Sequence, residues 1–198
     1  ETWRDENENL LTRRPGYAFT VASNRVLTAS FGVWRQGEIA SAAGPTLNTA
    51  RMSHNAITLP DGRTALFGGH GSGFVALNSS EFWVPGDENF TLAAMQYIHD
   101  WPAFAQLQDG RYLLAGGAGN SGVPGYATSE IFASDTNTFT AIGAMTMYRA
   151  AAGAATLTDG RVLIASGWWT HNAAHSYGEL LDTETGVFTM VGPFAVER

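Results

Sequence analysis

An internal repeat constrains this 198-residue chain more than any other feature of its sequence. A nine-residue motif that begins Asp-Gly-Arg recurs at steps of 48 and 50 residues, at 61–69, 109–117 and 159–167, and a degenerate copy occupies 23–31. Self-similarity at a fixed period indicates a repeat architecture, in which each copy is a supersecondary unit that buries its apolar face against its neighbours. Any fold expected for this chain must therefore repeat at this period.

Each full copy of the motif predicts a β-hairpin. The Asp-Gly pair tolerates the positive φ angles of a two-residue turn, and short apolar runs flank it, as at 56–59 and 64–67. A second unit follows each full copy and contains a Glu in an apolar run, a turn, and a further strand with an aromatic residue. Each period therefore contains four short strands, and we expect an all-β chain. The recurring residues are Glu81, Glu130 and Glu179, with Phe90, Phe139 and Phe188.

The pattern resembles the kelch repeat, most closely in its bacterial variant. That repeat combines an Arg, a strand that ends in Gly-Gly, a Glu followed by an aromatic position, and an Asn-Thr turn before a last aromatic residue. Arg51, Arg149 and Arg198 match the Arg of the repeat, and His99 takes its place in the second full copy. The resemblance covers nearly the whole chain and implies an all-β, kelch-type β-propeller built from antiparallel four-stranded blades.

The register of the repeat divides a single domain, 1–198, into about four blades. Three full blades are expected at 52–99, 100–149 and 150–198, a shortened blade at 14–51, and a lone outer strand at 1–13. Three arrangements are compatible with this register. The chain is part of a larger ring, or it closes a ring with a second copy or a partner chain, or it closes alone as a small ring. Exposed strand edges and apolar blade flanks favour association.

The absence of lysine and cysteine excludes several kinds of chemistry. All eleven cationic side chains are Arg, and there is no Cys. The chain therefore has no residue for a Schiff base, a thiol nucleophile or a thiolate metal site. A net charge of −7 argues against nucleic-acid binding, and no apolar run is long enough to span a bilayer. We expect no cofactor, and the composition with the non-Met first residue favours an extracellular or envelope location.

The resemblance also predicts which face binds a ligand. In a propeller of this type the loops between strands 2 and 3 and between strands 4 and 1 share one face, and the Asp-Gly turns lie on the other. The first face should carry 70–74, 119–126, 168–175 and the segment around His99 and Asp100. Aromatic and glycine-rich loops favour ligand contacts. The predicted contacts are Trp168, Trp169, His171, Tyr126, Arg149, Arg51 and Trp101.

Two other patterns favour structural roles. His171 and His175 would bring their imidazoles together only on a helix, whereas the stretch has the composition of a loop, so we expect no metal site. The Glu of each third strand recurs with the fold period, which indicates that it bonds neighbouring backbone. Arg51 and Arg149 recur in the same way, although an Arg at this position could also face the central channel and an acidic ligand.

We therefore expect a non-catalytic binding module for a protein or a carbohydrate, without assigned catalytic residues. One alternative is a segment of a kelch-like enzyme, similar to the oxidases or the sialic-acid epimerases of this fold. The oxidase site needs a Tyr cross-linked to Cys, which this chain cannot supply by itself, and the epimerase site uses a complete ring. A further alternative is an architectural segment of a larger surface protein or assembly, since one fold hosts many functions.

Overall fold

The chain forms two compact units, Glu1–Gly44 and Pro45–Arg198. The computed structural model describes residues 2–4, 10–12, 28–30, 45–120, 125–170 and 173–194, with side chains except at 2–4, 10–12, 28–30, 169–170 and 173. In this part of the chain no helix has the length and the apolar character that a bilayer crossing requires.

The first unit contains a small antiparallel sheet. Its strands are β1 (Thr2–Arg4), β2 (Leu10–Thr12) and β3 (Thr28–Ser30), in the order β2-β1-β3. Both β1 and β2 lie within 1–13, where a single outer strand was expected, and they pair with each other. Most of the expected shortened blade, namely 14–27 and 31–44, lies outside the described residues.

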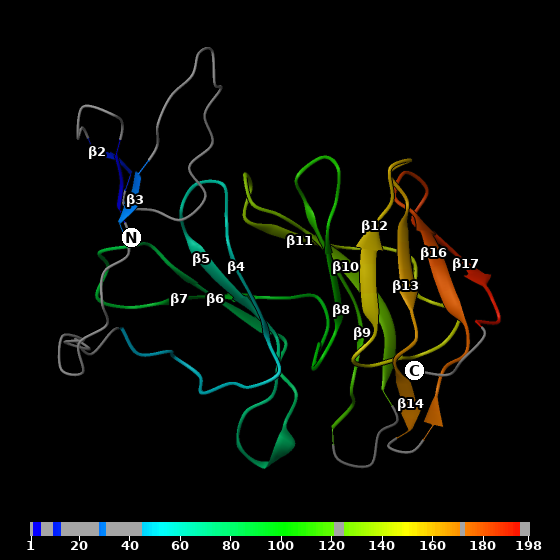
Figure 1. Cartoon of the computed structure of the whole chain (residues 1–198). Coiled ribbons are helices and arrows are strands. Elements are labelled where there is room, and N and C mark those ends of the chain that lie inside the picture. The colour runs from blue at the N-terminus through cyan, green and yellow to red at the C-terminus, as the bar shows by residue number, and fades with distance from the viewer. Residues whose placement is uncertain are drawn as a thin grey trace. The chain divides into compact units, whose positions relative to one another are not determined.

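Three antiparallel four-stranded sheets make up the second unit, and they follow one another along the chain (Figure 1). This confirms the prediction of an all-β chain with four strands in each full repeat. The first sheet contains β4 (Asn55–Thr58), β5 (Thr64–Phe67), β6 (Ser79–Trp83) and β7 (Thr91–Ala94). The second sheet contains β8 (Ala103–Gln106), β9 (Tyr112–Gly117), β10 (Tyr126–Ala133) and β11 (Thr138–Ala141). The third sheet contains β12 (Gly153–Thr156), β13 (Val162–Ala165), β16 (Gly178–Asp182) and β17 (Val187–Val191).

The Asp-Gly-Arg motif closes the first hairpin of each sheet, as its sequence predicts. Gly62, Gly110 and Gly160 have φ angles of 88°, 88° and 89°, which a side chain would strain. In the first hairpin the carboxylate of Asp61 accepts hydrogen bonds from the backbone N–H of Arg63 at 3.0 Å and from its guanidinium at 2.7 Å. The same two Asp–Arg hydrogen bonds recur in the other two hairpins. These bonds fix the turn, and being exposed they add little stability of their own.

Two apolar cores hold the three sheets together. Side chains alternate between the two faces of a strand, so the second sheet supplies one face to each core. Its Leu114 and Phe132 pack with the first sheet, and its Leu113 and Ile131 pack with the third sheet. The core between the first and second sheets is rich in aromatic rings, and the ring centroids of Phe67 and Phe132 lie 5.1 Å apart. Equivalent positions of successive repeats therefore make equivalent contacts between sheets.

Candidate functional site

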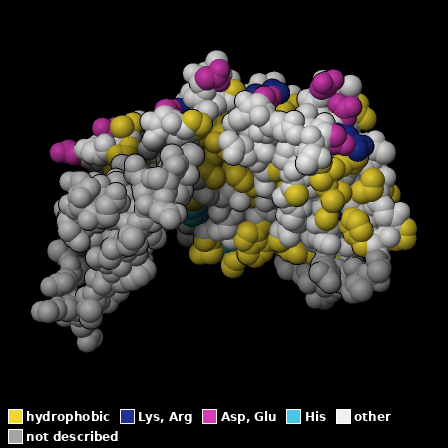
Figure 2. All heavy atoms as spheres, turned by 45° about the horizontal axis from the view of Figure 1, so that its top comes forward, with side chains coloured by type: hydrophobic (Ala, Val, Ile, Leu, Met, Phe, Trp, Pro, Cys, Tyr) yellow, Lys and Arg dark blue, Asp and Glu magenta, His cyan; other side chains and the backbone are white. Residues whose placement is uncertain are grey.

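The connections between sheets and the longer loops lie at the edge opposite the Asp-Gly-Arg turns. In Figure 1 these turns lie at the top of the three sheets, and the loop with η1 (Ser72–Phe74) and the hairpin of β14 (Trp168–Thr170) and β15 (Ala173–Ala174) lie at the bottom. We call the edge that carries these loops, opposite the Asp-Gly-Arg turns, the loop face. Figure 2 shows acidic and arginine side chains along the other edge and hydrophobic side chains gathered below them.

Backbone hydrogen bonds join the three repeats along the loop face. The first residue of each repeat forms an isolated bridge with a residue one to three positions beyond the end of the second strand: Met52 with His70, Asp100 with Ala118, and Ala150 with Trp168. The next residues along the chain are also joined, because Trp101 N donates to Ser53 O at 3.2 Å and Ala151 N donates to Trp101 O at 2.9 Å. Ser53, Trp101 and Ala151 share φ angles of 59°, 53° and 51°. The backbone of the face is thus periodic, while its side chains differ between repeats.

A cluster of rings spans loops from all three sheets; it comprises Phe74, His70, Trp101 and Trp168, and we call it the aromatic cluster. The rings of Phe74 and His70 have centroids 5.0 Å apart, and His70 meets the edge of Trp101 at 6.2 Å. Trp101 in turn meets Trp168 edge-to-face at 5.9 Å. Phe74 is 68% exposed and Trp101 is 44% exposed. Large exposed rings beside one another are typical of surfaces that bind a ligand.

A buried polar pair lies within the aromatic cluster. His70 Nδ1 lies 2.8 Å from Asp100 Oδ1, and the two residues are 2% and 5% exposed. Burial raises the pKa of the Asp100 carboxyl, and the hydrogen bond from His70 opposes this shift only in part. The other ring nitrogen, Nε2 of His70, is buried and has no hydrogen-bond partner among the described residues. The pair is therefore buried among exposed aromatic rings, and one of its hydrogen-bonding atoms, Nε2 of His70, is unpaired among the described residues.

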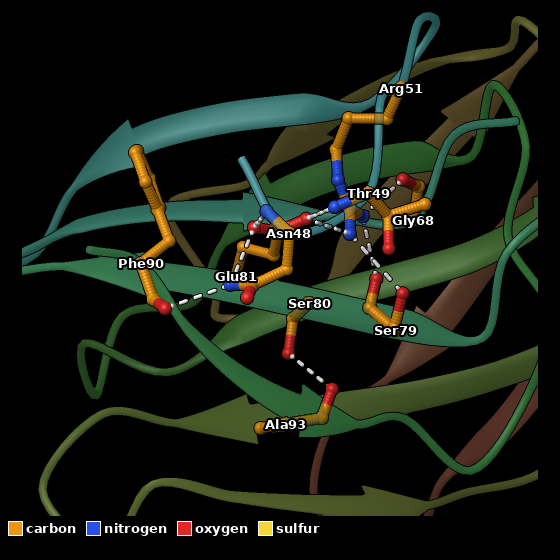
Figure 3. A network of polar contacts seen from close by, with 9 residues as sticks. All are labelled: Asn48, Thr49, Arg51, Gly68, Ser79, Ser80, Glu81, Phe90 and Ala93. Carbon is orange, nitrogen blue, oxygen red and sulfur yellow. Dashed lines mark hydrogen bonds and ion pairs between the residues drawn. The ribbon is translucent and has the colours of Figure 1, made fainter. Parts of the chain in front are cut away.

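Two of the three arginines that match the repeat, Arg51 and Arg149, have buried partners, and Arg198 lies outside the described residues. Arg51 donates to Gly68 O, Ser79 O and Glu81, with Nη2 2.8 Å from Glu81 Oε1 (Figure 3). Arg149 makes the corresponding contact with Glu179 at 3.1 Å. Both arginine side chains are fully buried. Sequence analysis placed them among the expected ligand contacts, and in the structure neither guanidinium reaches the surface.

The Glu of each third strand also binds the backbone, as its recurrence predicts. Glu81 accepts hydrogen bonds from Asn48 N at 2.7 Å and Thr49 N at 2.9 Å (Figure 3). Burial by itself raises the pKa of Glu81, but the hydrogen bonds from Arg51, Asn48 and Thr49 outweigh it and hold the pKa below its usual value. Glu179 and Glu130 bind backbone N–H groups in the same way. In the second repeat His99 takes the place of Arg, with Nδ1 2.6 Å from Gly116 O and Nε2 3.1 Å from Glu130.

The other predicted contacts are distributed differently. Tyr126 is half-buried at the start of β10, and its carbonyl accepts a hydrogen bond from Arg149 N at 3.4 Å. Trp169 belongs to β14, but its side chain is not described, and His171 lies outside the described residues. Of the predicted contacts, the structure brings Trp101 and Trp168 together. It adds Phe74, His70 and Asp100, which a comparison of repeats would have found, because Ala118 and Trp168 stand at the position of His70.

Three cavities in the described part of the chain are lined by residues outside the aromatic cluster, and one of them, of about 510 Å³, lies at the first turn of the second sheet. Another of about 870 Å³ opens at the opposite edge, between the turns of the second and third sheets, where Arg111 and Arg161 are already paired with Asp109 and Asp159. A smaller one of about 220 Å³ is lined by Thr146, Met147, Tyr148 and His175. Burial lowers the pKa of the His175 imidazole, so it is neutral at pH 7. No group of three or more potential metal-ligating side chains occurs within the described residues.

Neither a family model nor a curated protein matches this sequence. A proposal for the function therefore depends on the repeat pattern of the sequence and on the geometry of the loop face.

Proposed function

We propose that this chain is a kelch-type β-propeller, or a segment of one, that serves as a non-catalytic binding module for a protein or a carbohydrate. The resemblance to the kelch repeat supports the propeller, and so does the periodic packing of three four-stranded sheets. Ligands are bound at the loop face, where the connections between strands 2 and 3 and between strands 4 and 1 converge.

The observation that carries this proposal is the aromatic cluster. Its rings come from three separate connections, at Phe74, Trp101 and Trp168, and two of them are substantially exposed. A residue that only maintains the fold would recur at the same place in each repeat. The other repeats instead have Ser53 and Ala151 at the position of Trp101, and all three residues have similar positive φ angles. The exposed rings are thus additions to the fold, which is typical of a binding surface.

We also propose that a further sheet completes the ring by packing on the third sheet. In the second sheet, one face packs against the next sheet and is fully buried. The same positions in the third sheet are half-buried or exposed. Apolar residues at these positions favour a further sheet as their cover, whether from a longer form of the same protein, a second copy of the chain or a partner chain. They are Ala155, Leu157, Leu163, Ala165 and Leu180, equivalent to Ala105, Leu107, Leu113, Ala115 and Ile131.

The binding function is tested by screening the chain against a phage-displayed peptide library and a glycan array. Trp101→Ala is expected to weaken the strongest ligand by about tenfold or more, since aromatic anchors dominate binding energy. Ala suits this backbone, because Ala151 has the same φ angle within a few degrees. Trp83→Ala is the matched control: Trp83 lies in β6 and packs on Phe90, away from the cluster. Full binding by Trp101→Ala would refute the proposed face.

A further inference from the structure

The His70–Asp100 pair departs from the repeat at both of its positions. His70 corresponds to Ala118 and Trp168, and Asp100 corresponds to Met52 and Ala150. The backbone bridge forms in each case, so the fold needs neither a His nor an Asp here. Burying a carboxylate and an imidazole costs free energy that an apolar pair would avoid. Maintenance of the fold therefore does not account for the pair, and we infer that it contributes to binding.

The hydrogen bond from His70 to Asp100 determines what the remaining nitrogen can do. Asp100 Oδ1 lies 2.8 Å from Nδ1 of His70, and when the carboxyl is ionised it only accepts, so the proton between them belongs to Nδ1. In the neutral form of the ring Nε2 is then an acceptor, and it has no partner among the described residues. A ligand that completes this site has to offer a hydrogen-bond donor.

The surroundings of this acceptor select the kind of ligand. Phe74 and Trp101 contact the imidazole from two directions, and both expose much of their rings. A ligand that fits has an apolar surface to lie on these rings and a hydroxyl at its edge. Because Nε2 is buried, a hydroxyl reaches it only when a neighbouring side chain moves, and we assign this movement to Phe74, whose exposed ring lies 5.0 Å from the imidazole.

The charges around the site favour a neutral ligand. All arginine side chains that the structure describes are paired with carboxylates, and three of them lie in the turns at the opposite edge. The aromatic cluster contains no arginine, and the carboxylate of Asp100 lies beside its His70. Among the described residues, an acidic saccharide or an acidic peptide would thus find no unpaired arginine there and would meet the carboxylate of Asp100.

We propose that the aromatic cluster binds a neutral saccharide, whose C–H face stacks on Trp101 and Phe74 and whose hydroxyl donates to Nε2 of His70. This inference rests on the proposed binding function and specifies its ligand. His70 contacts the sugar directly, and Asp100 is a positioning residue that holds the imidazole in the tautomer with a free Nε2.

The test is a glycan array with neutral gluco-, manno- and galacto-oligosaccharides beside sialylated and sulfated ones, followed by calorimetric titration of the best neutral oligosaccharide. The wild-type chain is expected to bind neutral oligosaccharides. The double variant His70→Ala, Asp100→Ala is expected to bind about tenfold more weakly, the loss of one hydrogen bond. Both substitutions place alanine where other repeats have Ala118 and Ala150, and a thermal melt checks that the variant is folded.

A second readout reports on the nitrogen itself. In ¹⁵N spectra of the wild-type chain, the Nε2 signal of His70 is expected to shift when the oligosaccharide is added, as its lone pair becomes hydrogen-bonded. Asp100→Asn, which retains an acceptor for Nδ1–H, should keep binding within a few-fold. These results would support the saccharide and the role of both residues.

The outcomes separate this inference from the function on which it rests. If Trp101→Ala abolishes saccharide binding but the folded double variant binds normally, the binding face stands and the role of His70 is overturned. If only acidic glycans bind, or only peptides bind in a Trp101-dependent way, the neutral saccharide is overturned while the binding function stands. If nothing binds, or binding ignores Trp101→Ala, the proposed function fails as well.

Discussion

At the scale of single residues, one carboxylate in each repeat binds the segment of backbone that leads into its own sheet. Glu81 accepts two backbone N–H groups and a guanidinium at once, with no exposure of its side chain. A buried carboxylate is stable only when its oxygens are so well paired. The recurrence of this Glu in the sequence predicted such a role, and the hydrogen bonds confirm it. The sequence did not show that Arg51 and Arg149 serve the same network, because a periodic Arg can face either a channel or a carboxylate.

The lowered pKa of Glu81 predicts how the stability of the fold depends on pH. A carboxyl whose pKa is lower in the folded state stabilises the fold fully above its ordinary value of 4.5, and this contribution is lost as the pH falls through the folded value. We expect the free energy of unfolding, measured in urea, to fall below about pH 4.5 for this reason.

The variant Glu81→Gln isolates this effect. It should lose about 3 kcal/mol at pH 7, because Arg51 remains buried without its charged partner, and its stability should change less with pH in the acid range. Glu184→Gln, at an exposed position of the third sheet's last turn, is the control and should behave like the wild-type chain. An equal acid response in both variants would contradict the assignment to Glu81.

At the scale of elements, strands end where neighbouring backbones come close. Gly68 follows β5 with φ 63°, and a Cβ atom built on it would lie 2.1 Å from His99 O. Gly116 in β9 has the same close approach to Arg149 O, at 2.4 Å. The Gly-Gly pair of the sequence motif predicted crowding or a bend at this point. The partner in the close contact is the last residue before the next repeat, more than thirty residues along the chain, which local sequence does not reveal.

This crowding predicts a large difference between two alanine substitutions. Gly68→Ala should destabilise the fold by about 2 kcal/mol more than Gly62→Ala, since overpacking adds to the cost of the positive φ angle. Gly62 is the matched control because its φ angle is 88° and a Cβ atom there would meet nothing within 4 Å. Urea denaturation of the two variants measures the difference. Equal stabilities would show that the close contact at Gly68 relaxes freely.

At the scale of the whole molecule, the third sheet has an apolar face that no described sheet covers. The face that is fully buried in the second sheet carries half-buried leucines in the third, at Leu163 and Leu180. Covering them with another sheet would bury further apolar surface at roughly 25 cal/mol per Å². The proposed closure with a second copy or partner chain follows from this face.

We expect the purified chain to associate in a concentration-dependent way, and sedimentation velocity measures it. The double variant Leu163→Asp, Leu180→Asp should shift the chain to monomer, because two charges would be buried in the interface. Leu92→Asp is the control, since Leu92 is exposed on β7 away from the third sheet. A chain that stays monomeric at all concentrations would contradict self-association through this face.

The sequence by itself determined the strands, the Asp-Gly-Arg turns and the structural role of the repeated Glu. The turns depend on local backbone geometry, and the strands and the Glu follow from a repeat of 48 to 50 residues that is visible in the sequence. Tertiary structure alone decided which side chains meet on the loop face. His70 and Phe74 share one loop, whereas Trp101 and Trp168 come from connections about thirty residues or more away, and only sheet packing brings these rings within about 6 Å of their neighbours. It also decided that the repeat arginines are buried. Such long-range contacts depend on how the sheets pack, and no local pattern encodes them.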